Sequence, residues 1–326
     1  MGGTPQNAAL YRIALPTPYA VGDANVYLLE EGGRLILVDA GADTDECWEA
    51  FVRALAGFGF APSDISQVWL THTHPDHVGL IGRLTAVRDV PVFVHPKGIP
   101  YFTWDEAFHR MRIRFFERLY REMGCGEAGD RQIGRMEETL RRHLKKSPMA
   151  KDRVRPFPDG RLSPGVELLE TPGHAPDHVA FLLAESRKLI AGDLLLSRVS
   201  SNAFVEPDAD GHRILSLVEY VRSLEACAAL DVARVEPGHG DPVDRPRELA
   251  LYRLRRIGEK AEAVRSLVAQ GMATANEIAL RLYPAQYETQ FFAVMSEVVG
   301  LLDYLEFHRM VEKELRQGVW VYSCDF

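Results

Sequence analysis

The sequence predicts an α/β fold made of two similar halves, followed by a small domain that is mainly helical. Strand-like and helix-like stretches alternate up to residue 96, as in α/β proteins. A hairpin pattern at residues 24–39 occurs again at 178–193, and from about residue 248 the pattern becomes helical. With 326 residues, the chain can form one large domain, expected over residues 1–247, and a small one over 248–326.

The two hairpins resemble each other residue by residue. Residues 24–39 read ANVYLLEEGGRLILVD, where Glu-Glu-Gly-Gly-Arg is a turn signal between two strand-like runs. Residues 178–193 read HVAFLLAESRKLIAGD, and Asp39 aligns with Asp193 without a gap. We therefore expect an internal duplication that brings together the strand ends of two β/α halves.

The stretch after the first hairpin predicts a helix, a strand, a second helix and a second strand. The first helix lies within residues 43–59, with Asp43 or Thr44 as its cap and Gly57 and Gly59 at its end. SQVWLTH is expected as a strand, DHVGLIGRLTAV as a helix and VPVFVHP as a strand.

Residues 97–158 differ in composition because they are rich in arginine, lysine, methionine and aromatic residues. Two helices broken at GCGEAG are expected here. One interpretation is a solvated helical pair with an aromatic inner face. The other is a lid over the strand ends, apolar inside with a cationic rim. We favour the lid, because this insertion directly follows a strand that is expected to lie beside the histidine-rich stretch at residues 71–79.

The C-terminal region predicts three helices and a strand. The helices are LYRLRRIGEKAEAVRSLVAQG, ATANEIALRLYP and ETQFFAVMSEVVGLLDYLEFHRMVEKE, and the strand is GVWVYSC. This order suggests a winged-helix-like domain. Residues 250–326 carry about as many acids as bases, so the basic surface of a DNA reader is missing. Packing against the main domain or formation of a homodimer is the favoured role.

Composition limits the class of protein. The net charge is −8 and the isoelectric point about 5.8, which argues against nonspecific binding of duplex nucleic acid. The N-terminus has no basic start followed by an apolar stretch, and no run of about 18 apolar residues exists, so we expect no signal peptide and no membrane partner. The four cysteines are far apart and predict free thiols in a reduced, cytoplasmic protein.

Residues 71–79 read THTHPDHVG and crowd four ligand-type side chains behind an apolar run. If the strand continues to His74, then His72 and His74 point to the same face. The following proline disfavours a helical conformation at His74, so Asp76 and His77 begin the next helix. Imidazole and carboxylate groups bind divalent ions such as zinc, and two adjacent ions accommodate four such groups better than one tetrahedral ion.

Three further ligand-type residues also follow predicted strands. LLETPGHAPDH places His174 after a Pro-Gly turn, LIAGDLLL places Asp193 at a strand end, and RVEPGHGDP places His239 in another Pro-Gly-His turn. Sites of α/β proteins gather at the carboxyl ends of strands. We therefore expect these three residues to join the histidine cluster.

This series of motifs resembles the metallo-β-lactamase fold superfamily over roughly residues 8–245. The strand end LILVDAG resembles the first motif of that family. The resemblance implies a four-layer αββα sandwich with two central mixed sheets. It also implies two divalent ions, zinc first, with manganese or iron as alternatives. The implied ligands are His72, His74 and His174 for the first ion, Asp76, His77 and His239 for the second, and Asp193 as the bridge.

The resemblance further implies a hydrolase, in which a hydroxide bridging the two ions attacks a carbonyl or phosphorus. Asp76 can accept a hydrogen bond from that hydroxide. His178 is a second candidate catalytic residue that could contact the substrate or support a ligand. Asp39 is expected to orient a ligand histidine. Three polar residues that could line the pocket follow Asp193, namely Arg198, Ser201 and Asn202.

The favoured substrate is a thioester, ester or lactone with an anionic or acyl portion, because the cationic, aromatic insertion suits an amphipathic anion. Glyoxalase-II-like enzymes are the nearest class, although the insertion and the C-terminal domain depart from their pattern. The main alternative is an endoribonuclease, because a metallo-β-lactamase domain followed by a winged-helix-like tail resembles the lactamase-β-like endoribonucleases. The basic insertion could hold RNA. A mononuclear-iron persulfide dioxygenase is a further alternative.

Overall fold

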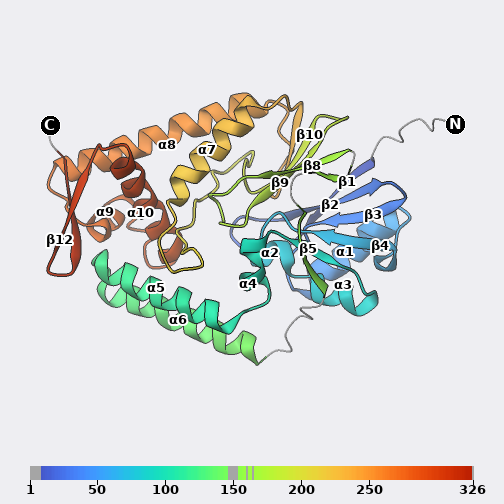
Figure 1. Ribbon diagram of the computed structural model, residues 1–326, viewed down its shortest axis with the longest axis horizontal. Coiled ribbons are helices and arrows are strands. Elements are labelled where there is room, and N and C mark those ends of the chain that lie inside the picture. The colour runs from blue at the N-terminus through green and yellow to red at the C-terminus, as the bar shows by residue number, and fades with distance from the viewer. Residues whose placement is uncertain (1–8, 146–152, 159–160, 164, 325–326) are drawn as a thin grey trace.

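Two β-sheets pack face to face between layers of helices in the computed structural model, which describes residues 9–145, 153–158, 161–163 and 165–324 (Figure 1). The first sheet has the order β1-β2-β3-β4-β5-β6 and the second the order β11-β10-β9-β8-β7. Both sheets are mixed, since β3 to β6 and the pair β10 and β11 are parallel, whereas the other neighbours are antiparallel. The predicted four-layer sandwich is confirmed. The strands are β1 (Ala9–Leu15), β2 (Ala24–Glu31), β3 (Arg34–Val38), β4 (Ile65–Trp69), β5 (Val92–Val94), β6 (Val154–Pro156), β7 (Arg161–Ser163), β8 (Val166–Glu170), β9 (Val179–Leu183), β10 (Lys188–Gly192) and β11 (Arg234–Pro237).

Alternation of side chains along the strands produces the separate cores of the sandwich. Leu28 and Leu37 point to the core shared with the helices outside the first sheet. Leu29 and Ile36 point to the core between the two sheets, which also contains Phe181. The helices outside the first sheet are α1 (Asp45–Gly57), α2 (Pro75–Val78) and α3 (Ile81–Val87), and those outside the second are α7 (Ser216–Ala229) and α8 (Pro246–Ala269).

Both predicted hairpins are present, as β2–β3 and β9–β10. Their registers differ, because Glu31 pairs with Arg34 across a two-residue turn whereas Leu183 pairs with Lys188 across a four-residue turn. In the sequence repeat, Lys188 aligns with Arg34, so the second hairpin is shifted by two residues. An even shift leaves each side chain on its own face of the sheet, so the repeated apolar residues remain buried.

The insertion contains α4 (Ile99–Phe102), α5 (Glu106–Glu122) and α6 (Gly126–Leu144), so the two predicted long helices are present. The break between them is shorter than predicted, because α6 begins at Gly126, within GCGEAG. Buried apolar side chains of α5 and of the first half of α6 belong to the same core as the C-terminal helices, whereas Phe102 of α4 belongs to the core outside the first sheet. The rings of Phe116 and Phe292 lie 5.4 Å apart, and those of Tyr120 and Phe291 lie 5.1 Å apart. The insertion therefore packs against the C-terminal region (Figure 1), and its action as a lid stays a prediction.

The C-terminal region follows the predicted order of three helices and then β structure. After α8 come α9 (Ala275–Leu282), α10 (Phe291–Phe307), β12 (Glu312–Arg316) and β13 (Val319–Ser323). The prediction that the third helix continues through VEKE is wrong. Arg309 turns into the left-handed region with a φ of 58° and closes the helix, although neither glycine nor proline marks this end. The winged-helix assignment stays a prediction.

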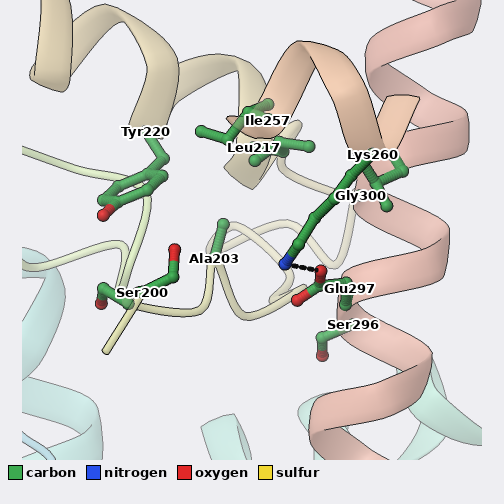
Figure 2. A pocket seen from close by; sticks show the side chains of 11 residues that line it. Ser200, Ala203, Leu217, Tyr220, Ile257, Lys260, Ser296, Glu297 and Gly300 are labelled. Atoms are coloured by element: carbon green, nitrogen blue, oxygen red, sulfur yellow. Dashed lines mark hydrogen bonds and ion pairs between the residues drawn. The ribbon is translucent and has the colours of Figure 1, made fainter. Parts of the chain in front are cut away.

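The C-terminal helices lie directly against the loop that follows Asp193. A cavity of about 30 Å³ remains where α7, α8 and α10 meet this loop. Figure 2 shows Lys260 reaching across it to Glu297, to which its ammonium group donates a hydrogen bond, while Ser200 and Ala203 line the other side. Such a volume suits a water molecule and not a substrate.

Two compositional expectations can be compared with the structure. All four cysteines are free, as predicted, and three of them are buried. Within the part of the chain that the structure describes, no helix has both the length and the apolarity needed to cross a membrane.

Candidate metal centre

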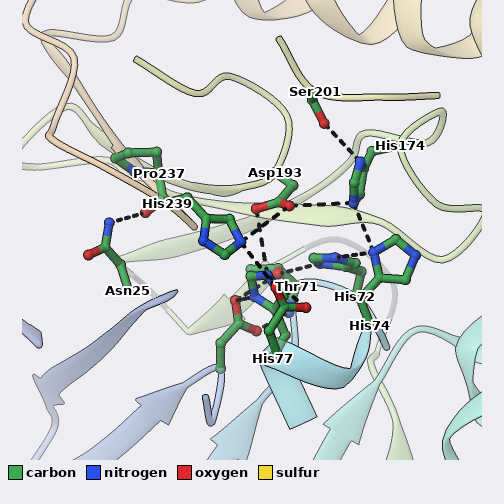
Figure 3. Close-up of polar contacts among 12 residues, drawn as sticks. Asn25, Thr71, His72, His74, His77, His174, Asp193, Ser201, Pro237 and His239 are labelled. Atoms are coloured by element: carbon green, nitrogen blue, oxygen red, sulfur yellow. Dashed lines mark hydrogen bonds and ion pairs between the residues drawn. The ribbon is translucent and has the colours of Figure 1, made fainter. Parts of the chain in front are cut away.

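The seven predicted ligand side chains gather at one edge of the sandwich, where strands of both sheets end (Figure 3). His72 and His74 follow β4, and Asp76 and His77 open α2. The other three follow β8, β10 and β11, and are His174, Asp193 and His239. All seven except His74 are classed as buried, so the site lies beneath the surface.

Three imidazole nitrogens converge in one half of the site. Nδ1 of His74 lies 3.0 Å from Nε2 of His72 and 2.9 Å from Nε2 of His174. Burial lowers the pKa of His74 to about 4 and holds the pKa values of His72 and His174 well below their usual range. All three rings are therefore neutral near pH 7, which is the form that binds a metal.

The partners of the outer ring nitrogens fix the tautomers of two of these histidines. Nδ1 of His174 lies 2.8 Å from the carbonyl oxygen of Asn202, to which it must donate. The Thr71 hydroxyl donates to Asp39 at 2.8 Å, so it accepts from Nδ1 of His72 at 3.0 Å. Both Nε2 atoms therefore direct lone pairs at the His74 nitrogen. A single proton on His74 Nδ1 can form a good hydrogen bond with only one of these two Nε2 atoms, whereas a single cation can bind all three nitrogens.

The other half of the site combines Asp76, His77 and His239, with Asp193 beside them. Nε2 of His239 lies 3.4 Å from Asp76 and 3.6 Å from Asp193, and Nε2 of His77 lies 3.6 Å from Asp193. Among the described residues, His77 Nε2, His239 Nε2 and Asp193 Oδ1 are buried without a hydrogen-bond partner. Such atoms are costly unless another group satisfies them, and a divalent ion fits this donor set.

The charges in this half also favour a cation. Burial lowers the pKa of His77, but the carboxylates of Asp39 and Asp193 outweigh this and raise it to about 10. Burial opposes ionisation of Asp76, yet the His239 imidazole, 3.4 Å away, and the other neighbouring imidazoles hold the pKa of Asp76 well below its usual range. In the absence of metal, the carboxylates thus attract a proton to His77. A divalent ion would supply that positive charge instead.

Asp193 lies between the two halves. Its Oδ2 is 3.5 Å from Nε2 of His174 in the first half and 3.6 Å from Nε2 of His239 in the second. A Cβ at Gly238 would lie 2.3 Å from Asp193 Oδ1, so only glycine lets the Pro-Gly-His turn approach so closely. This position suits the predicted bridging role.

His178 does not reach the interior of the site. Its Nε2 accepts a hydrogen bond from the Asp193 backbone N–H at 3.0 Å, and its Nδ1 lies 2.8 Å from the Thr171 hydroxyl. Because both nitrogens are engaged and the ring is buried, the geometry favours support of Asp193 over the contact with substrate that we considered. Asp39, in contrast, takes the expected position, with His77 Nδ1 at 2.8 Å.

The three polar residues expected to line the pocket divide into two groups. Arg198 points to solvent and pairs with Asp241 at 2.6 Å. Ser201 and Asn202 instead hold His174, since the Ser201 hydroxyl and the Asn202 carbonyl each lie 2.8 Å from its Nδ1. Sequence reasoning missed Phe204, whose ring lies 5.4 Å from His74 and 5.5 Å from His174.

Two adjacent groups of histidine and aspartate ligands at the strand ends of an αββα sandwich define the class of metal-dependent hydrolases with a metallo-β-lactamase fold. The family model described as Metallo-beta-lactamase superfamily matches residues 19–239. The chain belongs to this superfamily and is a metal-dependent hydrolase.

Relatives and solved structures agree with this assignment. The probable metallo-hydrolase YqjP of Bacillus subtilis strain 168 is 37% identical over 298 residues, which cover 90% of this chain and 91% of YqjP. The crystal structure of a metallo-beta-lactamase family protein from Thermus thermophilus has a TM-score of 0.77 and 29% identity, and the match covers 97% of this chain and 98% of that one. Thioesterase pkgB of Emericella nidulans is 27% identical over 77% of this chain and 57% of its own length.

Proposed function

We propose that the protein hydrolyses thioesters, and related esters or lactones, with two divalent ions, zinc foremost, held by the seven clustered side chains. The observation that carries this proposal is the set of unpartnered buried atoms of His77, Asp193 and His239 beside three converging imidazole nitrogens. Two such ions supply Lewis acidity and a nucleophile from water at neutral pH. The name of the relative pkgB supports a thioester as the bond that is cleaved.

The residues of the chain orient the attacking water and fix the ligands. Asp76 remains ionised, because its pKa is held well below the usual range by its imidazole neighbours against the effect of burial. Its carboxylate can therefore accept a hydrogen bond from the attacking water and orient it. Asp39 holds His77, and Asn202 holds His174, so that the ligand nitrogens face the interior of the site.

Aromatic side chains beside the metal centre suit the acyl portion of the substrate. The ring of Phe204 stacks on Phe292 at 5.4 Å with an interplanar angle of 21°, and both side chains are only partly buried. A cavity of about 740 Å³ lies beside the chain segments around Pro176 and Pro207, which form part of its wall. Tyr101 and Phe108 provide its aromatic lining. This volume is in the range of small-molecule sites.

The charges of the insertion favour an acyl substrate over RNA. Several of its arginines are already paired with carboxylates, which reduces the positive charge available to phosphates. Arg112 pairs with Glu206, and Arg131 with Glu288. Contacts with phosphates dominate the affinity of RNA-binding proteins, so pairing of these cations weakens the ribonuclease alternative.

The proposal is tested by incubating the metal-loaded protein with thioesters, lactones, phosphodiesters, RNA and a persulfide. We expect thioester hydrolysis, and a decrease of about 100-fold or more in kcat for Asp76→Asn. Asp231→Asn is the control, because Asp231 is exposed and, among the described residues, pairs only with Arg187. Cleavage of RNA without hydrolysis of thioesters would establish the ribonuclease alternative instead, and consumption of oxygen with persulfide would establish the dioxygenase.

A further inference from the structure

The segment from Ser201 to Glu206 connects the metal centre to the helices outside the sandwich. The first part of this segment exchanges two hydrogen bonds with His174, one donated by His174 and one accepted by it. His174 Nδ1 donates to the Asn202 carbonyl at 2.8 Å, and the Phe204 backbone N–H donates to the His174 carbonyl at 3.3 Å. The Phe204 ring packs against His74 and His174. The position of this segment therefore sets the position of two of the three converging histidines.

The other end of the segment is held by a buried ion pair. Glu206 accepts a hydrogen bond from Nε of Arg112 at 2.5 Å and a second one from its Nη2. The Tyr101 hydroxyl donates to the same carboxylate at 3.1 Å. Both members are shielded from water, because the side chains of Arg112 and Glu206 are 18% and 7% exposed. A bidentate pair of this kind fixes the geometry of both partners.

Aromatic rings hold the arginine in place. The guanidinium carbon of Arg112 lies 5.0 Å from the ring centre of Phe116 on α5 and 5.8 Å from that of Phe292 on α10. Phe292 also stacks on Phe204, so the insertion and the C-terminal helices both contact the segment. A planar guanidinium can stack and donate two parallel hydrogen bonds at once, which a lysine ammonium cannot do.

We infer that Arg112 is a positioning residue for the three-histidine half of the metal centre. By holding Glu206, it keeps Asn202 and Phe204 against His174 and His74. This inference rests on the proposed metal-binding function. It assigns a task in the site to the insertion, for which the sequence suggested either a solvated helical pair or a lid. Contacts that orient metal ligands from outside typically change metal affinity 10–100-fold, so removal of Arg112 should weaken one of two metal-binding steps by about this factor.

The test is a titration of metal-free protein with Co²⁺ or Zn²⁺ against a competing chelator, which resolves the two binding steps. Arg112→Lys keeps the charge and reduces the risk of misfolding, and Arg112→Gln and Glu206→Gln remove one partner each. We expect each variant to weaken one step about tenfold or more and leave the other within about twofold. The double variant should be no weaker than either single one, because both residues act as a unit.

The matched control is Arg110→Gln, which removes an exposed ion pair with Glu106 on the same helix and should change neither step. Equal weakening of both steps in proportion to a loss of thermal stability, or no change in either step, would overturn the inference. A second readout needs no metal: the imidazole nitrogen shifts of His174 report its Nδ1–H tautomer in the metal-free protein. If the parent protein binds no metal, the proposed function fails. If the His174 tautomer is the same in Arg112→Lys as in the parent, the positioning role is overturned separately.

Discussion

Nδ1 of His77 lies 2.8 Å from Oδ2 of Asp39, and both side chains are almost completely buried. The same carboxylate accepts hydrogen bonds from the backbone N–H and the hydroxyl of Thr71, each at 2.8 Å. That hydroxyl in turn accepts from His72. One aspartate therefore orients ligand-type histidines in both halves of the metal centre, His77 directly and His72 through Thr71.

Asp39→Asn should weaken both metal-binding steps. In Asp39, Oδ1 accepts from the Thr71 backbone N–H, and Oδ2 accepts from the Thr71 hydroxyl and from His77. An asparagine side chain has a single acceptor oxygen, so its amide NH2 group would face donors at one of these two positions. The backbone should tolerate the change, because asparagine adopts the left-handed conformation of Asp39, whose φ is 60°. We expect a decrease of about 10–100-fold in affinity at each step, measured by chelator competition. Asp45→Asn, at an exposed carboxylate that pairs with Arg83, is the control, and equal affinities in the two variants would contradict this role of Asp39.

Gly79 closes the stretch THTHPDHVG and should not tolerate alanine. A Cβ at this position would lie 2.1 Å from the backbone nitrogen of Asp43. The close approach allows the Gly79 N–H to donate to the Gly41 carbonyl at 2.7 Å. We expect Gly79→Ala to lower the free energy of unfolding by about 3 kcal/mol or more, measured in urea. Gly82→Ala is the matched control, since nothing lies within 4 Å of its Cβ position and alanine favours a helix. Similar stability of the two variants would refute the steric argument.

The ligand set could be predicted because each ligand lies in a short motif at a strand end. The four side chains from His72 to His77 lie in the short connection after β4 and in the first turn of α2, so they are close together in the chain. The tautomers could not be predicted in the same way, because they depend on Asn202 and on the Asp23 carbonyl, which follow no local pattern.

Other features depend on contacts between distant parts of the chain. Arg112 and Glu206 are 94 positions apart, and neither belongs to a motif. The second hairpin has a longer turn than the first although the sequences align. The sequence does not distinguish the two registers, because an even register shift leaves the same side chains on the buried face. The end of α10 was also missed, because an arginine takes the left-handed position that glycine usually occupies.

Asp193→Ala should reduce both metal content and activity. Asp193 Oδ2 lies within 3.6 Å of ligand-type nitrogens in both halves, and no other carboxylate among the described residues has this relation to His174 and His239. We expect the metal content to fall from about two ions per chain to one or fewer, measured by elemental analysis, with loss of hydrolysis. Asp231→Ala, at an exposed carboxylate that pairs with Arg187, should keep both. Full metal content in Asp193→Ala would remove Asp193 from the bridge.

Asp303 should make the stability of the metal-free protein depend on pH. It is buried in α10 and lies 2.9 Å from Nη2 of Arg213, yet neither carboxylate oxygen has an aligned hydrogen bond in the described structure. Burial raises the pKa of Asp303 from 3.8 to about 6, against the opposing effect of Arg213. The folded protein therefore binds more protons than the unfolded chain between these pH values, and the contribution of Asp303 to stability decreases as the pH rises through them.

The measurement compares urea unfolding of the parent and Asp303→Asn from pH 4 to pH 7 in the presence of a chelator. The free energy of unfolding of the parent, relative to the variant, should fall by on the order of 3 kcal/mol across this interval. The comparison with asparagine cancels the other titrating groups, including the buried histidines of the metal centre. A difference between the two proteins that stays constant with pH would show that Asp303 is ionised throughout, with Arg213 compensating fully for its burial.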